Sequence, residues 1–315
     1  MNLGVEIGGT KLQVGVCDRG GRIQQLMRVA VVRQNGARGI LDQLDRLIRP
    51  LLAGHEVEAV GIGFGGPVDA PHGRVVRSFH IKGWDGFALR RWFLRRFKLP
   101  TVIENDTNAA ALAEATIGAG RGHRAVLYSN VGTGIGGGFV VGGKIHNGRF
   151  GATEIGHTRF FARGRWRILE ELSSGLSIER GKTTLEVSAK YYGIALANAI
   201  TLLNPDIVVV GGGVARAGEK FLRPVRKTVE RFVFEPFRGN FRIVPAALGE
   251  TVVVVGAALL AAEKDSGQAP EKHPKSPRGT RDFCRSSRDQ NYRKQGRSPM
   301  QESGQVRHRN GKAEG

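Results

Sequence analysis

The sequence predicts an α/β protein of two domains, each built on a mixed sheet. Three observations predict this class. The chain opens with a β-meander, strands and helices then alternate, and the same order returns in the second half. Two glycine-rich blocks, residues 4–16 and 130–143, stand at matching places in the two halves. A cleft between the domains is the expected place for a ligand.

The first half carries both strand and helix periodicities. Residues 39–53 have apolar side chains at intervals of three and four, which predicts a helix. Residues 2–7 and 11–17 are joined by a glycine turn, which predicts two strands of a meander. The expected elements are strands at 2–7, 11–17, 22–32, 57–64 and 101–104, and helices at 39–53, 87–97 and 105–118.

The second half repeats this order with fewer elements. We expect strands at 124–130, 135–141, 206–210 and 241–244, and helices at 185–203, after Gly213 and near 253–264. The expected domains are residues 1–120 and residues 121–263. Residues 264–315 are rich in Ser, Pro, Gly and Gln and almost without periodic apolar residues, so we expect a disordered basic tail.

The net charge of +20 invites a nucleic-acid interpretation. The tail carries 13 Lys or Arg and 6 Asp or Glu, so it contributes +7 of this charge. A basic tail binds polyanions weakly and in a salt-dependent way. We therefore expect no specific nucleic-acid partner. The positive charge outside the tail would attract an anionic substrate.

Several classes of protein are disfavoured by what the sequence lacks. No apolar run approaches the roughly 20 residues that span a bilayer, so we expect no membrane partner. Glu6 stands where a signal peptide needs an apolar core, which indicates a cytoplasmic protein. The two cysteines, Cys17 and Cys284, lie far apart, so neither a disulfide framework nor a cysteine-based zinc site is expected.

The two glycine blocks suit tight turns that expose backbone N–H groups to a phosphate. The usual nucleotide fingerprints need a helix directly after the glycines. Residues 12–16 and 139–141 instead have a strand pattern. Two strand–turn–strand phosphate loops suggest a duplicated nucleotide-binding architecture, and the alternative is two ordinary glycine-rich hairpins.

Seven motifs in order then resemble one family, the ROK sugar kinases. The resemblance covers residues 4 to about 263 and implies the actin-like (ribonuclease H-like) ATPase fold of the bacterial glucokinases. The motifs are EIGGTK at 6–11, GFGGPVD at 63–69, ENDTNAAALAE at 104–114, GTGIGGG at 132–138, TEIGH at 153–157, LEELSSG at 169–175 and NPDIVVVGGGV at 204–214.

Asp106 is the candidate catalytic base for transfer of a phosphoryl group to a sugar hydroxyl. It lies at a strand-to-helix junction, where a carboxylate can face a cleft, although it could also serve only as a helix cap. A free Asp titrates near pH ~3.9, so we expect an ionised carboxylate at neutral pH. By resemblance, the sugar would be bound by Gly66, Asn105, Asp106, Glu154, His157 and Glu170.

The phosphate donor would bind at three glycine turns. The first turn would approach the terminal phosphates, the second the β-phosphate, and the third would lie under the adenosine. The residues are Gly8, Gly9, Thr10 and Lys11, then Gly132, Thr133 and Gly134, then Gly211, Gly212 and Gly213. We expect ATP and Mg²⁺ as cofactors, because the phosphates need charge neutralisation and Mg²⁺ needs few protein ligands.

The chain departs from the family pattern in its second half. Most ROK proteins carry a C-x-C-G-x-x-G-C zinc motif where this chain has TRFFARGRWRI, at residues 158–168. We therefore predict no structural zinc and no protein ligands for a metal. The stretch between residues 175 and 191 is also shorter than the family's usual one, although the resemblance still implies a homodimer.

The sequence thus predicts an ATP-dependent kinase that phosphorylates a hexose, most simply glucose, at its 6-hydroxyl. Kinases for N-acetylglucosamine or N-acetylmannosamine share the same sugar residues and remain alternatives. Polyphosphate is the alternative donor, because polyphosphate glucokinases are ROK-like and zinc-free. Lys11 favours ATP. A non-catalytic sugar sensor is the alternative of another class, and retention of Asp106 and the phosphate loops disfavours it.

Overall fold

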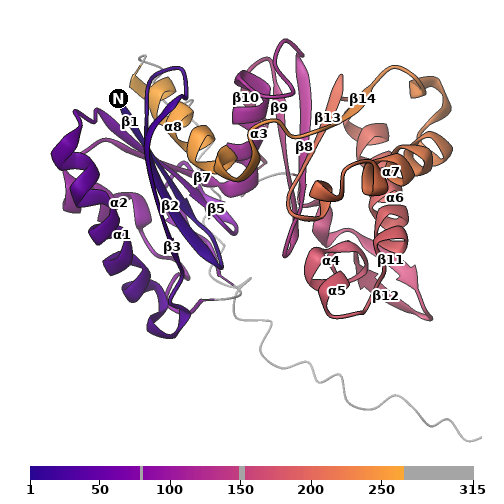
Figure 1. Cartoon of the computed structure of the whole chain (residues 1–315), viewed down its shortest axis with the longest axis horizontal. Helices are drawn as coiled ribbons and strands as arrows, with labels where there is room; N and C mark the ends of the chain where they lie inside the picture. The colour runs from indigo at the N-terminus through magenta and orange to yellow at the C-terminus, as the bar shows by residue number, and fades with distance from the viewer. Residues whose placement is uncertain (79–80, 149–152, 266–315) are drawn as a thin grey trace, which may run out of the picture. The chain divides into compact units, whose positions relative to one another are not determined.

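The computed structural model describes residues 1–78, 81–148 and 153–265, and these belong to one compact unit. The expected tail, apart from its first two residues, lies outside the described residues. The elements are arranged around two five-stranded sheets (Figure 1). No helix among the described residues is both long and apolar enough to cross a membrane.

The first sheet has the strand order β3-β2-β1-β4-β7. Strands β1, β2 and β3 are antiparallel neighbours, and β4 and β7 extend the sheet in parallel. All six residues of β1 are buried, as befits the middle strand of a covered sheet. The bounds are β1 Asn2–Ile7, β2 Lys11–Cys17, β3 Ile23–Ala30, β4 Ala59–Phe64 and β7 Thr101–Asn105.

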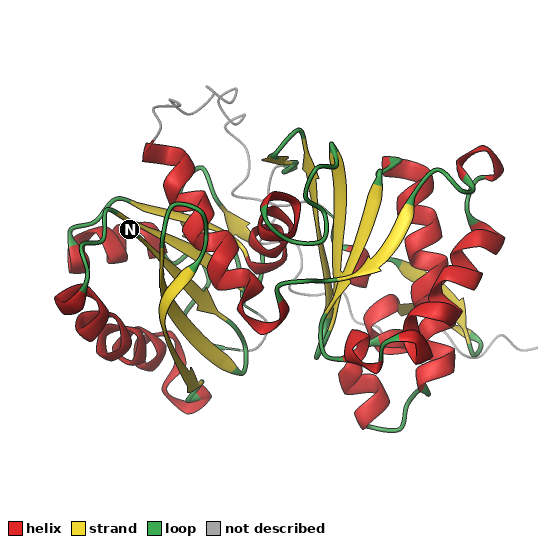
Figure 2. Cartoon of the chain, turned by 45° about the horizontal axis from the view of Figure 1, so that its top comes forward, coloured by secondary structure: helices red, strands yellow, loops and turns green. Residues whose placement is uncertain are grey.

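Helix α1 (Gly36–Gly54) buries one apolar stripe in the core of this sheet, while its opposite side is exposed. Helix α2 (Leu89–Phe97) adds Leu89 and Phe93 to the same core. A short hairpin of β5 (Val68–Asp69) and β6 (Arg74–Val75) and the 3₁₀ turn η1 (Arg33–Asn35) complete the first half. In Figure 2 these helices and strands can be followed by type.

One further helix packs on the first sheet at backbone-to-backbone distance. Helix α8 (Val252–Asp265) contacts β1 and β4, and it also packs against α3 (Asp106–Thr116). A Cβ atom on Gly4 would overlap the carbonyl oxygen of Val254, and one on Gly61 that of Ala257. Glycine therefore permits a backbone-to-backbone approach here.

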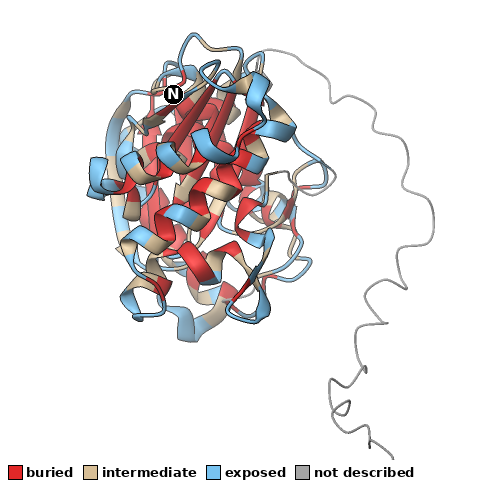
Figure 3. Cartoon of the chain, turned by 90° about the vertical axis from the view of Figure 1, so that its right-hand side faces the viewer, coloured by how far each residue is buried: buried red, intermediate tan, exposed pale blue. Residues whose placement is uncertain are grey.

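The second sheet has the strand order β10-β9-β8-β13-β14. Its antiparallel hairpin of β8 and β9 is followed by parallel β13 and β14, so this sheet is also mixed. Buried residues concentrate in the strands (Figure 3). The bounds are β8 Ala125–Val131, β9 Ile135–Val141, β10 Lys144–Ile145, β13 Ile207–Gly211 and β14 Arg242–Pro245.

Helices α6 (Leu185–Leu203) and α7 (Glu219–Phe232) pack against each other and share the core of the second sheet. A separate hairpin, β11 (Arg159–Ala162) with β12 (Arg165–Ile168), precedes two short helices. These are α4 (Leu169–Ser173) and α5 (Gly175–Glu179). The remaining 3₁₀ turns are η2 Ile155–His157, η3 Val214–Ala217, η4 Glu235–Phe237 and η5 Gly249–Thr251.

The α/β class with mixed sheets is confirmed. The helix expected after Gly213 is a 3₁₀ turn there, and α7 begins at Glu219. Elements between residues 144 and 179 were not predicted from the sequence. The domain border at residue 120 stays a prediction, and α8, which lies within the expected range of the second domain, packs on the first sheet.

Gly61→Ala tests the close approach of α8 to β4. The added methyl group overlaps the Ala257 carbonyl, so α8 must shift and the free energy of unfolding should fall by about 3 kcal/mol or more. Urea unfolding followed by circular dichroism measures the change.

Gly54→Ala is the matched control, because nothing lies within 4 Å of a Cβ there. In the last position of α1 the alanine should leave the protein equally stable or stabilise it by up to about 1 kcal/mol. Equal urea midpoints for the two variants would contradict the described packing.

Candidate active site

A cavity of about 720 Å³ is lined by residues that follow strands of both sheets. Asp106 and Lys11 come from the first half of the chain, and Thr133 and Gly212 from the second. Glu250, in the turn η5, and Val253, at the start of α8, also line it. Pockets of this size are typical of small-molecule sites.

Asp106 is placed by the junction between β7 and α3. The N-cap of α3 is Asn105, whose Oδ1 accepts hydrogen bonds from the backbone N–H groups of Thr107 at 2.9 Å and Asn108 at 3.2 Å. Asp106 is thus the first helical residue and not the cap. Its carboxylate accepts a hydrogen bond from the Thr107 N–H at 2.9 Å, and it lines the cavity.

The carboxyl group of Asp106 does not keep its ordinary acidity. Burial and, after it, the negative charges of Glu6 and Glu154 raise its pKa to about 7. The expectation of an ordinary ionised Asp was therefore wrong, because the sequence shows neither the burial nor the two neighbouring carboxylates. A group with a pKa near 7 is suited to accept and release a proton at neutral pH.

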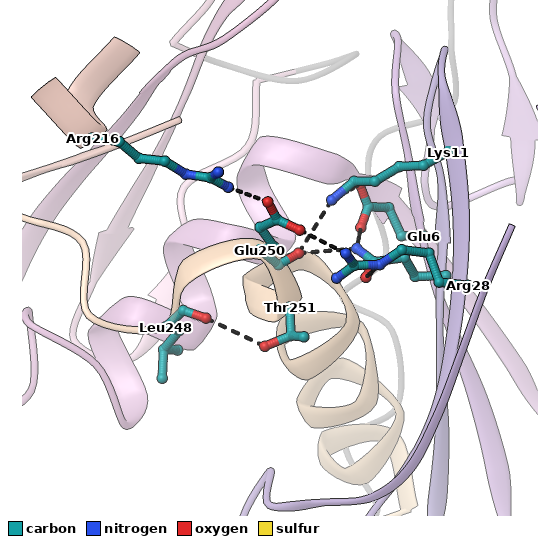
Figure 4. Close-up of polar contacts among 8 residues, drawn as sticks. Glu6, Lys11, Arg28, Arg216, Leu248, Glu250 and Thr251 are labelled. Atoms are coloured by element: carbon teal, nitrogen blue, oxygen red, sulfur yellow. Dashed lines mark hydrogen bonds and ion pairs between the residues drawn. The ribbon is translucent and has the colours of Figure 1, made fainter. Parts of the chain in front are cut away.

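Lys11 and Glu6 face each other across the hairpin of β1 and β2. The Lys11 Nζ lies 3.6 Å from Glu6 Oε1 and donates to the carbonyl oxygen of Glu250 at 3.3 Å (Figure 4). Gln13 donates both to the Glu6 carboxylate and, at 2.9 Å, to the same carbonyl. Burial raises the pKa of Glu6, and the positive charge of Lys11 opposes that shift.

Glu250 joins two arginines of different elements. Its Oε2 accepts from Arg28 Nη1 of β3 at 2.7 Å, and its Oε1 accepts from Arg216 of η3 (Figure 4). The hydrogen bond from Arg216 and the positive charges of Arg216 and Arg28 hold the pKa of Glu250 below its usual range. The wall of the cavity thus carries Lys11 and Arg216, with the Glu250 carboxylate bonded to Arg216.

The first glycine turn joins β1 to β2. The Gly8 N–H donates to the Lys11 carbonyl at 3.1 Å, which closes the turn, and Arg33 donates to the Gly9 carbonyl at 2.7 Å. Thr10 is exposed. Of the four predicted residues, Lys11 lines the cavity, whereas Gly8, Gly9 and Thr10 form the turn beside it.

The second glycine turn is fixed by two partners. Gly132 donates to Gly134 at 2.9 Å within the turn, and its carbonyl accepts from Gly175 of α5 at 2.7 Å. The Glu170 carboxylate accepts from the N–H of Ile135 at 3.0 Å. Gly132 and Thr133 line the cavity, and Gly134 lies against Glu170.

The third glycine turn follows β13. Gly212 has φ +92°, and a Cβ there would meet the backbone of Val131, so only glycine fits. Gly212 and Gly213 line the cavity, whereas Gly211 ends β13 and packs against the Tyr128 hydroxyl. Two of the three predicted glycines therefore lie at the cavity itself.

The predicted sugar residues fall into two groups. Gly66 and Asn105 are joined by a hydrogen bond of 3.1 Å from the Asn105 side chain to the Gly66 carbonyl, directly beside Asp106. Glu154 precedes η2 and His157 is its last residue; both are exposed, and the charge of Glu154 acts on Asp106. Glu170, by contrast, is bonded to the second glycine turn.

Several cavity residues were not predicted from the sequence as site residues, among them Glu6, Asn130, Arg216 and Glu250. The first two lie inside the glycine blocks, which was the available signal. Asn130 Oδ1 is buried without a hydrogen-bond partner among the described residues, so it is an acceptor open to a ligand. Glu250 has no motif around it, and only the fold brings it to Lys11.

Glycine turns that can hold phosphates, around a carboxyl group that can take a proton, are the parts of a phosphotransferase. A model of the ROK family matches residues 2–181 and 171–264. The chain belongs to the ROK family.

Relatives support one activity within this family. The glucokinase of Streptomyces coelicolor is 32% identical over 321 residues, covering 84% of this chain and 98% of that protein. A crystal structure of a ROK family glucokinase from Streptomyces griseus in complex with glucose and AMPPNP is 33% identical with a TM-score of 0.73, covering 83% and 99% of the two chains. An inorganic polyphosphate/ATP-glucomannokinase from Arthrobacter is 27% identical with a TM-score of 0.68, covering 84% and 98%. The chain is a sugar kinase with the actin-like ATPase fold.

Asp106→Asn should stabilise the protein at pH 8. The folded-state pKa of about 7 lies above the ordinary value, so burial of the charged form costs stability above pH 7. This cost disappears as the pH falls from 7 toward 4, because the folded protein then binds the proton. We expect Asn to raise the unfolding free energy by more than about 1 kcal/mol at pH 8, and by less at pH 5.

Thermal unfolding at the two pH values measures this difference. Asp42→Asn, at an exposed position of α1, is the control and should change neither value. An Asp106→Asn variant less stable than the parent at pH 8 would show that the buried charge is fully compensated.

Proposed function

We propose that this kinase transfers the γ-phosphoryl group of ATP to the 6-hydroxyl of a hexose, with glucose as the substrate. The supporting observation is that one cavity gathers Asp106, Lys11 and the second and third glycine turns. A proton acceptor and phosphate-binding groups thus share a single wall. The glucokinase relatives support a hexose as the acceptor.

In the proposed reaction the hexose hydroxyl oxygen attacks the γ-phosphorus, and the bond from that phosphorus to the β–γ bridging oxygen breaks. The hydroxyl proton passes to the Asp106 carboxylate, and ADP leaves. Lys11 and the exposed N–H groups of the turns would stabilise charge on the phosphate oxygens. Since the pKa of Asp106 is near 7, about half of the free enzyme holds the base in its active form at neutral pH.

The hexose would lie between Asp106 and the residues proposed to bind it. Gly66 and Asn105 are joined beside Asp106, and Glu154 is close enough to influence its charge. His157 and Glu170 would bind the remaining hydroxyls. The bond from Ile135 to Glu170 would then connect the sugar to the second glycine turn.

Mg²⁺ would neutralise the phosphates when bound. The described residues hold no group of three or more His, Cys, Asp or Glu that could bind a metal. Mg²⁺ is usually held by one or two carboxylates together with substrate phosphates, so such a group is not required. Glu6, a cavity carboxylate 3.6 Å from Lys11, is the residue that would hold it. A homodimer and a cytoplasmic location stay predictions.

ATP is favoured over polyphosphate by two observations. The solved Streptomyces griseus relative was crystallised with AMPPNP, and the third glycine turn lines the cavity where an adenosine would extend. The Arthrobacter relative, whose name includes both donors, keeps polyphosphate as the second candidate.

Asp106→Asn should lower kcat by about 10²- to 10⁴-fold, because the variant lacks the proton acceptor. In the parent enzyme kcat/KM should fall tenfold per pH unit below about 7, since the protonated carboxyl is inactive. A coupled assay from pH 5.5 to 9 measures both effects. Asp42→Asn, outside the cavity, should keep the parent profile; a parent profile flat through pH 7 would exclude Asp106 as the titrating base.

The substrate is tested by a panel of hexoses with ATP and with polyphosphate. We expect the highest kcat/KM with glucose and ATP, and slower turnover of N-acetylglucosamine and N-acetylmannosamine. Substrate discrimination is a difference in transition-state binding, so the ratios of kcat/KM measure it directly. A higher kcat/KM with polyphosphate, or with an N-acetyl sugar, would overturn the corresponding half of the proposal.

A further inference from the structure

A second cavity, of about 370 Å³, lies under the β11–β12 hairpin. Four of its lining residues are cations and one is a carboxylate. They are Arg163, Arg165, Arg167 and Lys182, with Glu171 as the acid. The hairpin, α4 and α5 lie together in Figure 1. The cavity shares none of its lining residues with the candidate active site.

The cations outnumber the groups that could neutralise them. Glu171 is bonded to one of them, with Arg167 Nη1 at 3.6 Å from its Oε2. Arg167 Nε also donates to the Ala162 carbonyl at 3.4 Å. Arg163, in the turn of the hairpin, and Arg165, at the start of β12, are exposed. Because side chains alternate along a strand, Arg165 and Arg167 lie on the same face of β12.

The wall also holds an unsatisfied polar group. Thr183 is only 8% exposed, and its hydroxyl has no hydrogen-bond partner among the described residues. A buried hydroxyl without a partner costs free energy, so a ligand that accepts from it would bind more tightly. The backbone N–H of the neighbouring Lys182 is already used, since it donates to Ser177 at 2.9 Å.

We propose that this cavity binds a small phosphorylated anion. Arginine guanidinium groups pair with phosphate oxygens through two parallel hydrogen bonds. A volume of about 370 Å³ exceeds what one phosphoryl group fills and falls in the range of small-molecule pockets. The ligand is therefore a pyrophosphate-like anion or a phosphate ester with a small organic body.

Helices α4 and α5 contact both the second cavity and the second glycine turn of the active site. In α4 the adjacent residues Glu170 and Glu171 are bonded to the second glycine turn and to Arg167. In α5, Gly175 donates to Gly132, and Ser177, which lines the second cavity, donates to the Glu170 carbonyl at 3.2 Å. An anion that moved Arg167 or α5 would therefore act on the phosphate turn, and the proposal includes this regulatory role.

Binding is tested by titration calorimetry with two probes, inorganic pyrophosphate and glucose 6-phosphate. Glucose and AMPPNP are present at saturation so that the active site is filled. We expect the wild-type protein to bind at least one probe with one site per chain. Absence of binding for both probes would overturn the proposal.

The double variant Arg163→Gln/Arg165→Gln should weaken binding of that probe by about tenfold or more, through loss of two charge-assisted contacts. The control pair Arg159→Gln/Arg180→Gln removes the same charge from exposed positions of β11 and of the end of α5 that do not line the cavity. It should change the affinity by less than about twofold. If both pairs weakened binding equally, general surface charge would explain the affinity, and the assignment of the site to this cavity would be wrong.

Thr183→Val provides a second readout that does not depend on charge. Removal of an unpaired buried hydroxyl should leave the unfolding temperature of the free protein unchanged or higher, while the stabilisation by pyrophosphate becomes smaller. A lower unfolding temperature without ligand, or an unchanged stabilisation with it, would contradict the assigned hydroxyl.

Regulation is tested by the reciprocal effect on nucleotide affinity. If the two cavities are coupled, the probe should change the AMPPNP dissociation constant by the factor by which AMPPNP changes that of the probe. An AMPPNP affinity independent of the probe would overturn the regulatory role. The Arg163→Gln/Arg165→Gln pair and Thr183→Val change the second cavity alone and need no turnover, so failure of this site is distinguishable from failure of the proposed sugar or donor.

Discussion

The position of α8 is the constraint on which the candidate active site depends. Gly4 and Gly61 let this helix lie directly on the backbone of β1 and β4, and Gly256 lets it approach α3 in the same way. Side chains at these positions would lift the helix from the sheet. Because η5 runs into α8, this packing also carries Glu250 to the cavity, where its carbonyl accepts from Lys11 and Gln13.

Burial and the charged residues of the first sheet set the pKa of the Asp106 carboxyl group. Glu6 lies on β1 and is only 6% exposed, and its charge opposes ionisation of Asp106. The positive charge of Lys11 opposes the rise that burial causes in the pKa of Glu6. The negative charge on β1 therefore acts across β4 on the carboxyl group that follows β7, and it favours the protonated form of Asp106 near neutral pH. A bound polyphosphate chain would add negative charge to this cavity, and only Lys11 and Arg216 among its lining side chains carry positive charge.

The sequence predicted the parts of the site that are local. The glycine turns follow strands at the expected places, and Asp106 stands at the start of α3 because a polar cap, Asn105, precedes it. Contacts between residues far apart in the chain could not be predicted. Glu250 meets Lys11 across 239 residues, and the pKa of Asp106 depends on Glu6, which reaches it only through the sheet. The β11–β12 hairpin was missed because its arginines interrupt the apolar alternation.

Adjacent glutamates on α4 show what the fold adds to a motif. In LEELSSG the sequence alone does not decide whether Glu170 or Glu171 belongs to the active site. One residue of helical rotation separates them by about 100°. The structure accordingly gives them opposite partners: the N–H of Ile135 for Glu170, and Arg167 for Glu171. One short helix therefore faces both the phosphate turn and the arginine-lined cavity, so any motion of α4 has to change both.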